Sequence, residues 1–250
     1  FVFTSAQNNT FLNEDFFLAL EAYCEARAAQ LHISRFVYNK ASYGENSVKP
    51  GSKKATDSDD MWFDPRINPY VSDESLEITD DLIWCGELNV IPTRINPLSS
   101  YKTYTRKASG IIPHAKMALE SVPTMKRDPA KFMYTTGAVT ARNYIQKAAG
   151  QVADFHHVFG ALVVEVDERG NWWARQLNAD KYGGFYDLDT YWTKNGQPLQ
   201  YSKNYMRFPV AAITHGDIHW AKVDRAVLET GSAPGGVVDQ LRPRQQFFHD

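Results

Sequence analysis

The spacing of apolar and polar positions predicts a β-α-β opening. Residues 1–6 (FVFTSA) form an apolar run that is typical of a buried strand, and residues 31–39 (LHISRFVYN) predict a second strand. Between them, residues 11–30 place apolar side chains at helical spacing. This order favours a parallel, three-layer sheet. The apolar face of the predicted helix comprises Phe16, Leu20, Tyr23 and Cys24.

The middle of the chain predicts strands, turns and one long loop. Residues 40–60 are polar and rich in Gly, Ser and Lys, which is typical of a surface loop. Residues 131–140 (KFMYTTGAVT) predict a strand that ends in small residues. Residues 157–177 predict a β-hairpin, because an apolar strand and an aromatic strand flank turn residues 167–171.

The pattern changes near residues 202–208 and then begins a second unit. Residues 209–219 (PVAAITHGDIH) and 244–250 (RQQFFHD) predict strands. Between them, VDRAVLET and VVDQLRP predict two short helices around the loop SAPGG. We therefore expect an α/β protein. Its domains are an N-terminal mixed α/β sheet domain with a β-hairpin (residues 1–205) and the beginning of a second α/β domain (residues 206–250).

Composition narrows the classes of protein. Hydrophobic residues make up 43% and charged residues 22%, which is ordinary for a globular protein. The two cysteines, Cys24 and Cys85, lack CxxC spacing, so a disulfide framework or thiolate zinc site is not expected. No apolar run reaches the roughly 18 residues that span a membrane, and no secretory signal is present. We expect a soluble protein in the reducing cytoplasm, with no membrane partner.

Both ends of the sequence have an unusual character. The chain starts at Phe1, inside a predicted strand, and stops at Asp250 directly after an apolar pair. Natural termini are usually polar and poorly ordered. We therefore expect the second domain to continue beyond Asp250.

Charge is distributed unevenly. Residues 57–87 hold ten acidic residues and one basic residue, whereas residues 102–147 hold nine basic and two acidic residues. The basic segment can mark a surface for an anionic ligand such as DNA. The alternative is that both segments are solvated faces whose charges pair across the fold.

The main candidate site combines Asp217-x-His219 with His249-Asp250. Each pair follows a predicted strand, and ligands of open α/β sheets bind at the carboxyl ends of strands. If the two strands are parallel neighbours, the four side chains share one rim. Carboxylate and imidazole together suit divalent ions such as Mn, Fe, Zn or Mg. Two such ions are the arrangement that metal-assisted phosphoester hydrolysis requires.

These motifs resemble those of the calcineurin-like metallophosphoesterases. THGDIH is similar to the D-x-H motif of that family, and FFHD is similar to its second motif, which usually reads Gly-Asp. The resemblance implies that Asp217 and His219 bind one ion and that Asp250 bridges two, most often Mn. His249 stands where the family has Gly. The family's later Asn-His and His motifs would follow Asp250.

Other segments resemble a phage-encoded group of these proteins that degrades DNA. They are FVFTSAQNNT, TTGAVT, FHHVFGALVVEVD, RQLNADKYGGFYDLD and HGDIH. The resemblance implies a metal-dependent phosphodiesterase, a phage nuclease of host DNA degradation or DNA transfer, acting in the host cytoplasm. His215 or His249 would donate to the phosphate or to the leaving group. The basic segment would bind the DNA backbone.

Several alternatives remain open at this stage. Asp217 could cap the following helix and His219 could be an ordinary surface histidine. The protein could also be a non-catalytic binding protein that engages a host protein, and it could form a homo-oligomer. Residues 5–10 offer a polar rim for a phosphate, although an N-cap by Asn9, Thr10 or Asn13 explains them equally well.

Two further observations restrict the chemistry. His156 and His157 are adjacent, and neighbouring residues on a strand point to opposite faces, which favours a structural role over a shared ion. The chain has neither a GxxxxGK[ST] loop nor a nucleophile elbow, so ATP hydrolysis and acyl transfer are not supported.

Overall fold

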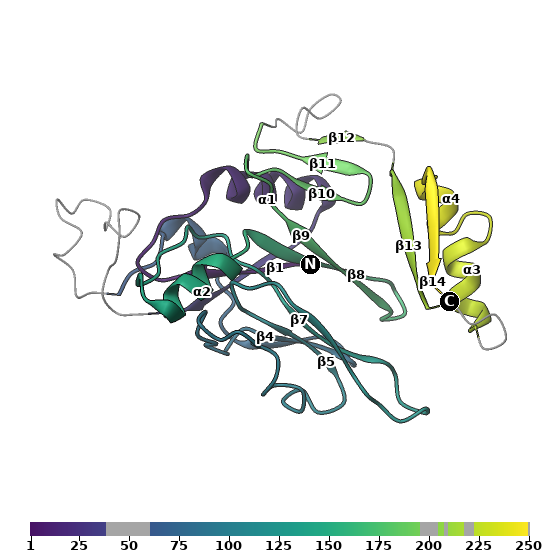
Figure 1. The fold of residues 1–250 in the computed structure, drawn as a ribbon, viewed down its shortest axis with the longest axis horizontal. Coiled ribbons are helices and arrows are strands. Elements are labelled where there is room, and N and C mark those ends of the chain that lie inside the picture. Colours follow the sequence, from purple (N-terminus) through teal and green to yellow (C-terminus); the bar gives the residue numbers. More distant parts are fainter. Residues whose placement is uncertain (39–60, 196–204, 208–209, 218–222, 250) are drawn as a thin grey trace.

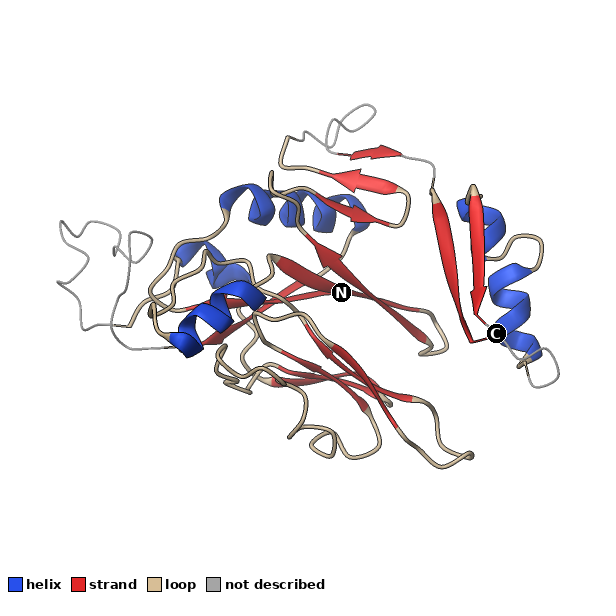
Figure 2. Ribbon diagram, in the orientation of Figure 1, coloured by secondary structure: helices blue, strands red, loops and turns tan. Residues whose placement is uncertain are grey.

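The structure, a computed structural model, describes residues 1–38, 61–195, 205–207, 210–217 and 223–249. It confirms an α/β fold, in which the described strands form a four-stranded, a five-stranded, a three-stranded and a two-stranded sheet. Helices and sheets occupy distinct layers (Figure 2). The loop expected at residues 40–60 lies outside the described residues.

The four-stranded sheet has the order β2-β1-β8-β9. β1 and β2 are parallel over six residue pairs, as the β-α-β pattern predicts. On its other side, however, β1 pairs antiparallel with β8, so the expectation of a parallel sheet is wrong beyond the first two strands. The sheet is mixed because a strand from a distant part of the chain completes it. Its strands are β1 (Val2–Gln7), β2 (Leu31–Phe36), β8 (Gly160–Val166) and β9 (Trp172–Asn178).

The predicted hairpin is confirmed as β8 and β9, which pair antiparallel along their full lengths. Asp167 closes the turn, because its carboxylate accepts hydrogen bonds from the backbone N–H groups of Arg169 and Asn171 at 2.9 and 2.8 Å. Gly170 has a φ of +81°, a conformation that only glycine adopts without strain.

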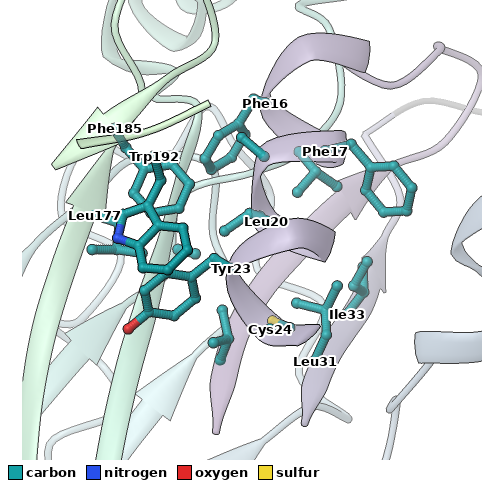
Figure 3. Packing of buried hydrophobic residues seen from close by; sticks show 14 of the residues in the cluster. Phe16, Phe17, Leu20, Tyr23, Cys24, Leu31, Ile33, Leu177, Phe185 and Trp192 are labelled. Atoms are coloured by element: carbon teal, nitrogen blue, oxygen red, sulfur yellow. The ribbon is translucent and has the colours of Figure 1, made fainter. Parts of the chain in front are cut away.

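Helix α1 (Glu14–Arg27) covers one face of this sheet. It begins at Asn13, whose Oδ1 accepts from the N–H of Phe16 at 3.2 Å, so the last of the three proposed caps is the one used. Figure 3 shows its apolar face packed against strand residues. Tyr23 makes edge contacts with Phe185 and Trp192, at centroid distances of 5.6 and 4.8 Å.

A five-stranded sheet of order β3-β4-β5-β7-β6 packs against the opposite face of the four-stranded sheet. Phe3 from β1 lies 4.9 Å from the ring of Trp84 in β4, and Leu162 and Val164 of β8 belong to the same buried cluster. The core therefore has three layers: α1, the four-stranded sheet and the five-stranded sheet. The strands are β3 (Ser75–Thr79), β4 (Leu82–Cys85), β5 (Ser109–Ile112), β6 (Leu119–Val122) and β7 (Lys131–Thr135).

Smaller elements complete the first part of the chain. The 3-10 helix η2 (Pro65–Tyr70) precedes β3, and α2 (Ala148–His156) precedes β8. The three-stranded sheet has the order β10-β11-β12 and is antiparallel throughout. Its strands are β10 (Phe185–Asp187), β11 (Thr190–Trp192) and β12 (Tyr205–Arg207).

A buried ionic network joins α1, β9 and β10. The Asp187 side chain is fully buried and accepts from the hydroxyl of Tyr23 at 2.9 Å and from Nε of Arg175 at 2.7 Å. Arg175 also contacts the exposed Glu165 at 2.9 Å. Burial disfavours the charged guanidinium, but the bonds to Asp187 and Glu165 outweigh it and raise the pKa of Arg175.

The last part of the chain confirms the predicted strand, two helices and strand. β13 and β14 are parallel neighbours, and α3 and α4 lie between them in the sequence. Figure 1 shows this unit beside the other sheets. Its described side chains are exposed or half-buried, and none is buried. Whether it is a separate domain from residue 206 onward stays a prediction. The elements are β13 (Ala212–Asp217), α3 (Arg225–Ser232), α4 (Val237–Leu241) and β14 (Gln245–His249).

In the described ranges, every helix is too short or too polar to cross a bilayer.

Candidate functional site

The backbone register brings the two candidate motifs to the same edge of the β13–β14 sheet. Asp217 is the last residue of β13, and its register partner is His249, the last residue of β14. Because the strands are parallel, both residues lie at carboxyl ends, where α/β sheets place ligands. The prediction that the two strands are parallel neighbours is therefore confirmed, with Asp217 opposite His249, whereas a rim shared by all four side chains stays a prediction.

A β-bulge precedes the rim. The pairing register shifts between Thr214 and Asp217, so β13 carries an extra residue relative to β14. Bulges of this kind redirect the end of a strand and are frequent beside active sites. Within the bulge, Gly216 has open space where a Cβ would project. This irregularity lies directly before Asp217, the first residue of the D-x-H motif.

His215 is held against β14. Its ring stacks on Phe248 with a centroid distance of 4.4 Å and an interplanar angle of 5°, and its Nε2 lies 3.0 Å from Oε1 of Gln246. Two contacts therefore fix the plane of the imidazole. A role for His215 as a proton donor to a phosphate stays a prediction.

One alternative for Asp217 is overturned. The helix after β13 begins at Asp224, whose carboxylate accepts from the backbone N–H groups of Ala226 and Val227 at 2.8 and 3.4 Å. Asp224 therefore supplies the N-cap that Asp217 could have supplied. The carboxylate of Asp217 is not needed for this helix.

The proposed ligands are only partly described. The structure gives the backbone of Asp217 and His249 but not their side chains, and His219 and Asp250 lie outside the described residues. Within the described ranges, no group of three or more His, Cys, Asp or Glu residues could hold a metal ion. The ligand set Asp217, His219 and Asp250 thus stays a prediction, as does a catalytic role for His249.

The two cysteines are buried and unbonded to each other. Burial raises the pKa of Cys24 and of Cys85 to about 12, so neither thiol is ionised near neutral pH. Thiolate chemistry is not favoured.

Some cations of the basic segment (residues 102–147) form ion pairs or are buried within the fold. Lys102 pairs with Glu120 at 2.6 Å and Lys107 pairs with Asp128 at 3.5 Å, so both ion pairs are made within the segment. Lys131 is buried, and burial lowers its pKa. Pairing across the fold with residues 57–87 is not observed among the described residues. Exposed cations of the segment remain available to an anionic partner.

Two histidines, His157 and His114, are buried in the core and hydrogen-bonded there. His157 is buried, and its Nε2 lies 2.9 Å from the carbonyl of Thr140 while its Nδ1 lies 2.6 Å from the hydroxyl of Tyr144. The structural role predicted for His157 is confirmed, although it follows helix α2 and does not lie on a strand. His114, which the sequence did not single out, is also buried, and its Nδ1 accepts from the N–H of Lys116 at 2.9 Å.

The polar stretch at residues 5–10 is a packed junction. Ser5 donates to the carbonyl of Gly137 at 2.7 Å, and the backbone N–H of Gln7 donates to Thr140 at 2.9 Å. Residues 5–10 are all buried. With the cap assigned to Asn13, this stretch joins β1 to residues 137–143, and a phosphate site there is not supported.

Comparison with known proteins gives one informative match. The chain is 37% identical over 258 residues to Protein A1 of Escherichia phage T5, in an alignment that covers 100% of the chain and 44% of that protein. The chain thus spans less than half the length of this relative. No protein-family model and no solved structure matches the chain. The chain is a homologue of a phage protein, as its sequence led us to expect.

Proposed function

We propose that the protein is a metal-dependent phosphodiesterase of a phage, specifically a DNA nuclease that acts in host DNA degradation or DNA transfer. The observation that carries the proposal is the parallel register of β13 and β14, which puts Asp217 of HGDIH opposite His249 of FFHD at the carboxyl ends of both strands. Homology to a phage protein supports a phage origin, and the proposal places the activity in the host cytoplasm.

The donor set fits divalent metal ions. Asp217, His219 and Asp250 would hold the ions, with Mn as the preferred metal and Mg, Fe or Zn as alternatives. Ions at this rim would bind phosphate oxygens and stabilise the charge that develops on the leaving oxygen. His215 and His249 are the candidate proton donors. The assignment of Asp224 as the α3 cap supports this role, because it leaves the carboxylate of Asp217 to other partners.

Metal binding tests the proposal directly. We expect the full chain to bind Mn²⁺, measured by the loss of the free-ion EPR signal, and Asp217→Asn to weaken binding by about tenfold or more, because a carboxylate ligand becomes a neutral amide. Glu229→Gln removes one carboxylate from the exposed surface of α3 and is the matched control. Equal Mn²⁺ affinity in Asp217→Asn and the wild type would contradict the proposal.

Activity is the second measurement. Hydrolysis of a phosphodiester such as bis(4-nitrophenyl) phosphate should require Mn²⁺, stop in EDTA and fall in Asp217→Asn. Hydrolysis that persists in Asp217→Asn with EDTA present would exclude the site.

A non-catalytic role through protein–protein contacts is the second candidate. It is favoured by large apolar side chains at the surface, among them Phe155 on α2, Tyr182 before β10 and Phe248 on β14. Failure to bind Mn²⁺, combined with a stable complex with a purified host protein, would favour this role over the enzyme.

A further inference from the structure

The connection between β6 and β7 contains a basic β-turn at its middle. The N–H of Asp128 donates to the carbonyl of Met125 at 2.8 Å, which closes a turn over residues 125–128. Lys126 and Arg127 occupy its two central positions, and both are exposed. In Figure 1 the chain leading into β7 extends beyond the end of its sheet. The two cations therefore lie at the apex of a projecting hairpin.

A second turn, residues 101–108, lies beside this apex. Nζ of Lys107 lies 3.5 Å from the carboxylate of Asp128, which links the two turns. The buried Lys131, at the start of β7, donates to the carbonyl of Arg106 at 2.6 Å and also to that of Lys102. Since Lys131 is held in the core, it fixes the second turn against the base of the hairpin. The side chains of Arg106 and Lys107 are exposed there.

These contacts gather four cations, Arg106, Lys107, Lys126 and Arg127, which we call the basic tip. Lys107 is the member with an ion pair; Arg106, Lys126 and Arg127 make none with the described residues. Asp128 is the carboxylate within the cluster. The basic tip therefore has an excess of positive charge on two turns that the fold holds together.

Two of the acidic groups nearby are already engaged. Glu120, on the neighbouring strand β6, pairs with Lys102 at 2.6 Å. Asp81, which precedes β4 at the same end of the sheet, accepts hydrogen bonds from Trp172 and Thr79 at 2.8 Å each. Asp80 is the remaining carboxylate of that turn. Among the described residues, the apex cations Lys126 and Arg127 form no ion pair with a carboxylate.

We propose that the basic tip binds the phosphate backbone of duplex DNA. Exposed Lys and Arg side chains are the groups that contact DNA phosphates, and a two-stranded β-ribbon fits the major groove. The hairpin apex, residues 123–130 (PTMKRDPA), has no aromatic side chain, and the exposed ring of the second turn, Tyr104, is held by a hydrogen bond from its hydroxyl to Glu87 at 2.7 Å. The apex cations therefore have no stacking group beside them of the kind that proteins use for single strands. This inference rests on the proposed function in taking DNA as the substrate, but the surface it names is distinct from the metal rim.

The turns are already ordered without DNA, which favours binding in a defined geometry. Pro123 and Pro129 restrict the backbone on either side of the apex, and the Asp128-to-Met125 hydrogen bond closes it. Binding then orders few additional groups, which lowers its entropic cost.

The test is DNA affinity of the full chain as a function of salt, with EDTA present throughout. Fluorescence anisotropy with a short labelled duplex should give a linear fall of log K with log salt between about 50 and 200 mM. The double variant Lys126→Ala, Arg127→Ala should bind more weakly and reduce the salt slope by about 2, since each lost phosphate contact removes about 0.9. Both positions are exposed turn sites, and circular dichroism checks the fold.

The matched control is the double variant Arg169→Ala, Lys181→Ala. It removes the same charge from exposed positions in the β8–β9 turn and in the loop before β10. The control should keep the wild-type slope and affinity within about twofold. Equal slopes in the wild type and the basic-tip variant, or equal losses in that variant and the control, would overturn the proposal.

Further measurements distinguish duplex DNA from other anionic partners, and distinguish failure of this inference from failure of the proposed function. Tighter binding to single-stranded DNA than to duplex, or loss of affinity for polyglutamate but not for duplex, overturns the assignment to duplex DNA. Asp217→Asn should keep full DNA affinity in EDTA. If no Mn²⁺ binds to the wild type while the basic tip still binds duplex, the proposed function fails and this inference stands.

Discussion

Replacing Asp187 by alanine should lower the free energy of unfolding by about 3–5 kcal/mol, because removing one partner of a buried pair leaves the other charge uncompensated. The Asp187 side chain has no solvent exposure, and Arg175, its principal partner, is only 21% exposed. The variant also leaves the buried hydroxyl of Tyr23 without its acceptor. Denaturant unfolding at neutral pH, with an unchanged m-value, measures the loss.

The control for this prediction is Glu165→Gln. Glu165 contacts the same guanidinium of Arg175, but its side chain is 57% exposed, and exposed pairs contribute about 0–1 kcal/mol. Tyr23→Phe removes only the hydroxyl and should cost about 1 kcal/mol. An Asp187→Ala loss no larger than that of Glu165→Gln would show that the network does not stabilise the fold.

Acid should destabilise the protein before most carboxylates titrate. Burial lowers the pKa of His114 to about 4 and, together with the Arg142 guanidinium, that of His157 to about 3. The unfolded value is about 6.5, so the unfolded chain takes up protons first as the pH falls. The contribution is fully present above pH 6.5 and is lost as the pH falls from there towards the folded pKa values. Each histidine costs about 1.4 kcal/mol per pH unit, or roughly 5 kcal/mol for both by pH 4.5.

Urea unfolding at a series of pH values between about 7 and 4.5 measures this slope. His157→Gln removes one titrating group and should make the dependence flatter. His156→Gln is the control, because its ring lies against exposed Phe155 and not in the core. A stability that stays constant from pH 6.5 to 4.5 would be incompatible with two buried neutral histidines.

Local sequence signals predicted the elements that depend on local chemistry. The strand at residues 1–6, the helix with Asn13 as cap and the Asp167 turn are each specified by neighbouring residues. The strand, two helices and strand of residues 212–249 have the same property, which is why the parallel rim was predictable. Apolar runs alone were sufficient to predict parallel strand pairs where a connecting helix joins the two strands.

In the five-stranded sheet, β7 (Lys131–Thr135) confirms the strand predicted within residues 131–140, but the other four strands could not be predicted in this way. Its strands have four or five residues, and β4 (LIWC) and β5 (SGII) are continuous rather than alternating, so their periodicity is not distinctive. Helix α2 was missed for a related reason, since Lys147 precedes it without a side-chain cap. The partners of the Asp187 carboxylate, Tyr23 and Arg175, are also distant in sequence and follow only from the fold.

The candidate site shows the same division. The sequence predicted that HGDIH and FFHD end adjacent strands, and the backbone bears this out. It did not indicate that His215 lies against Phe248, because that contact depends on how the connecting helices return the chain. The Asp224 cap of α3 is a local contact that was missed although the neighbouring residues specify it. Nor did charge counting separate the exposed Lys126 from the buried Lys131.

The position of β1 sets the order in which the core can assemble. The paired residues of β1 and β2 are fewer than thirty positions apart in the sequence. The other edge of β1 pairs with β8, where Val2 lies opposite Val163, so this edge stays unpaired until β8 has been synthesised. Closing that long loop is slow, and at about 5–20 residues per second of synthesis the free edge is exposed for many seconds. The β1–α1–β2 unit therefore forms early, as a template with one open side. We expect the hairpin β8–β9 to form as a second local unit, whose docking onto β1 closes the open edge of the four-stranded sheet.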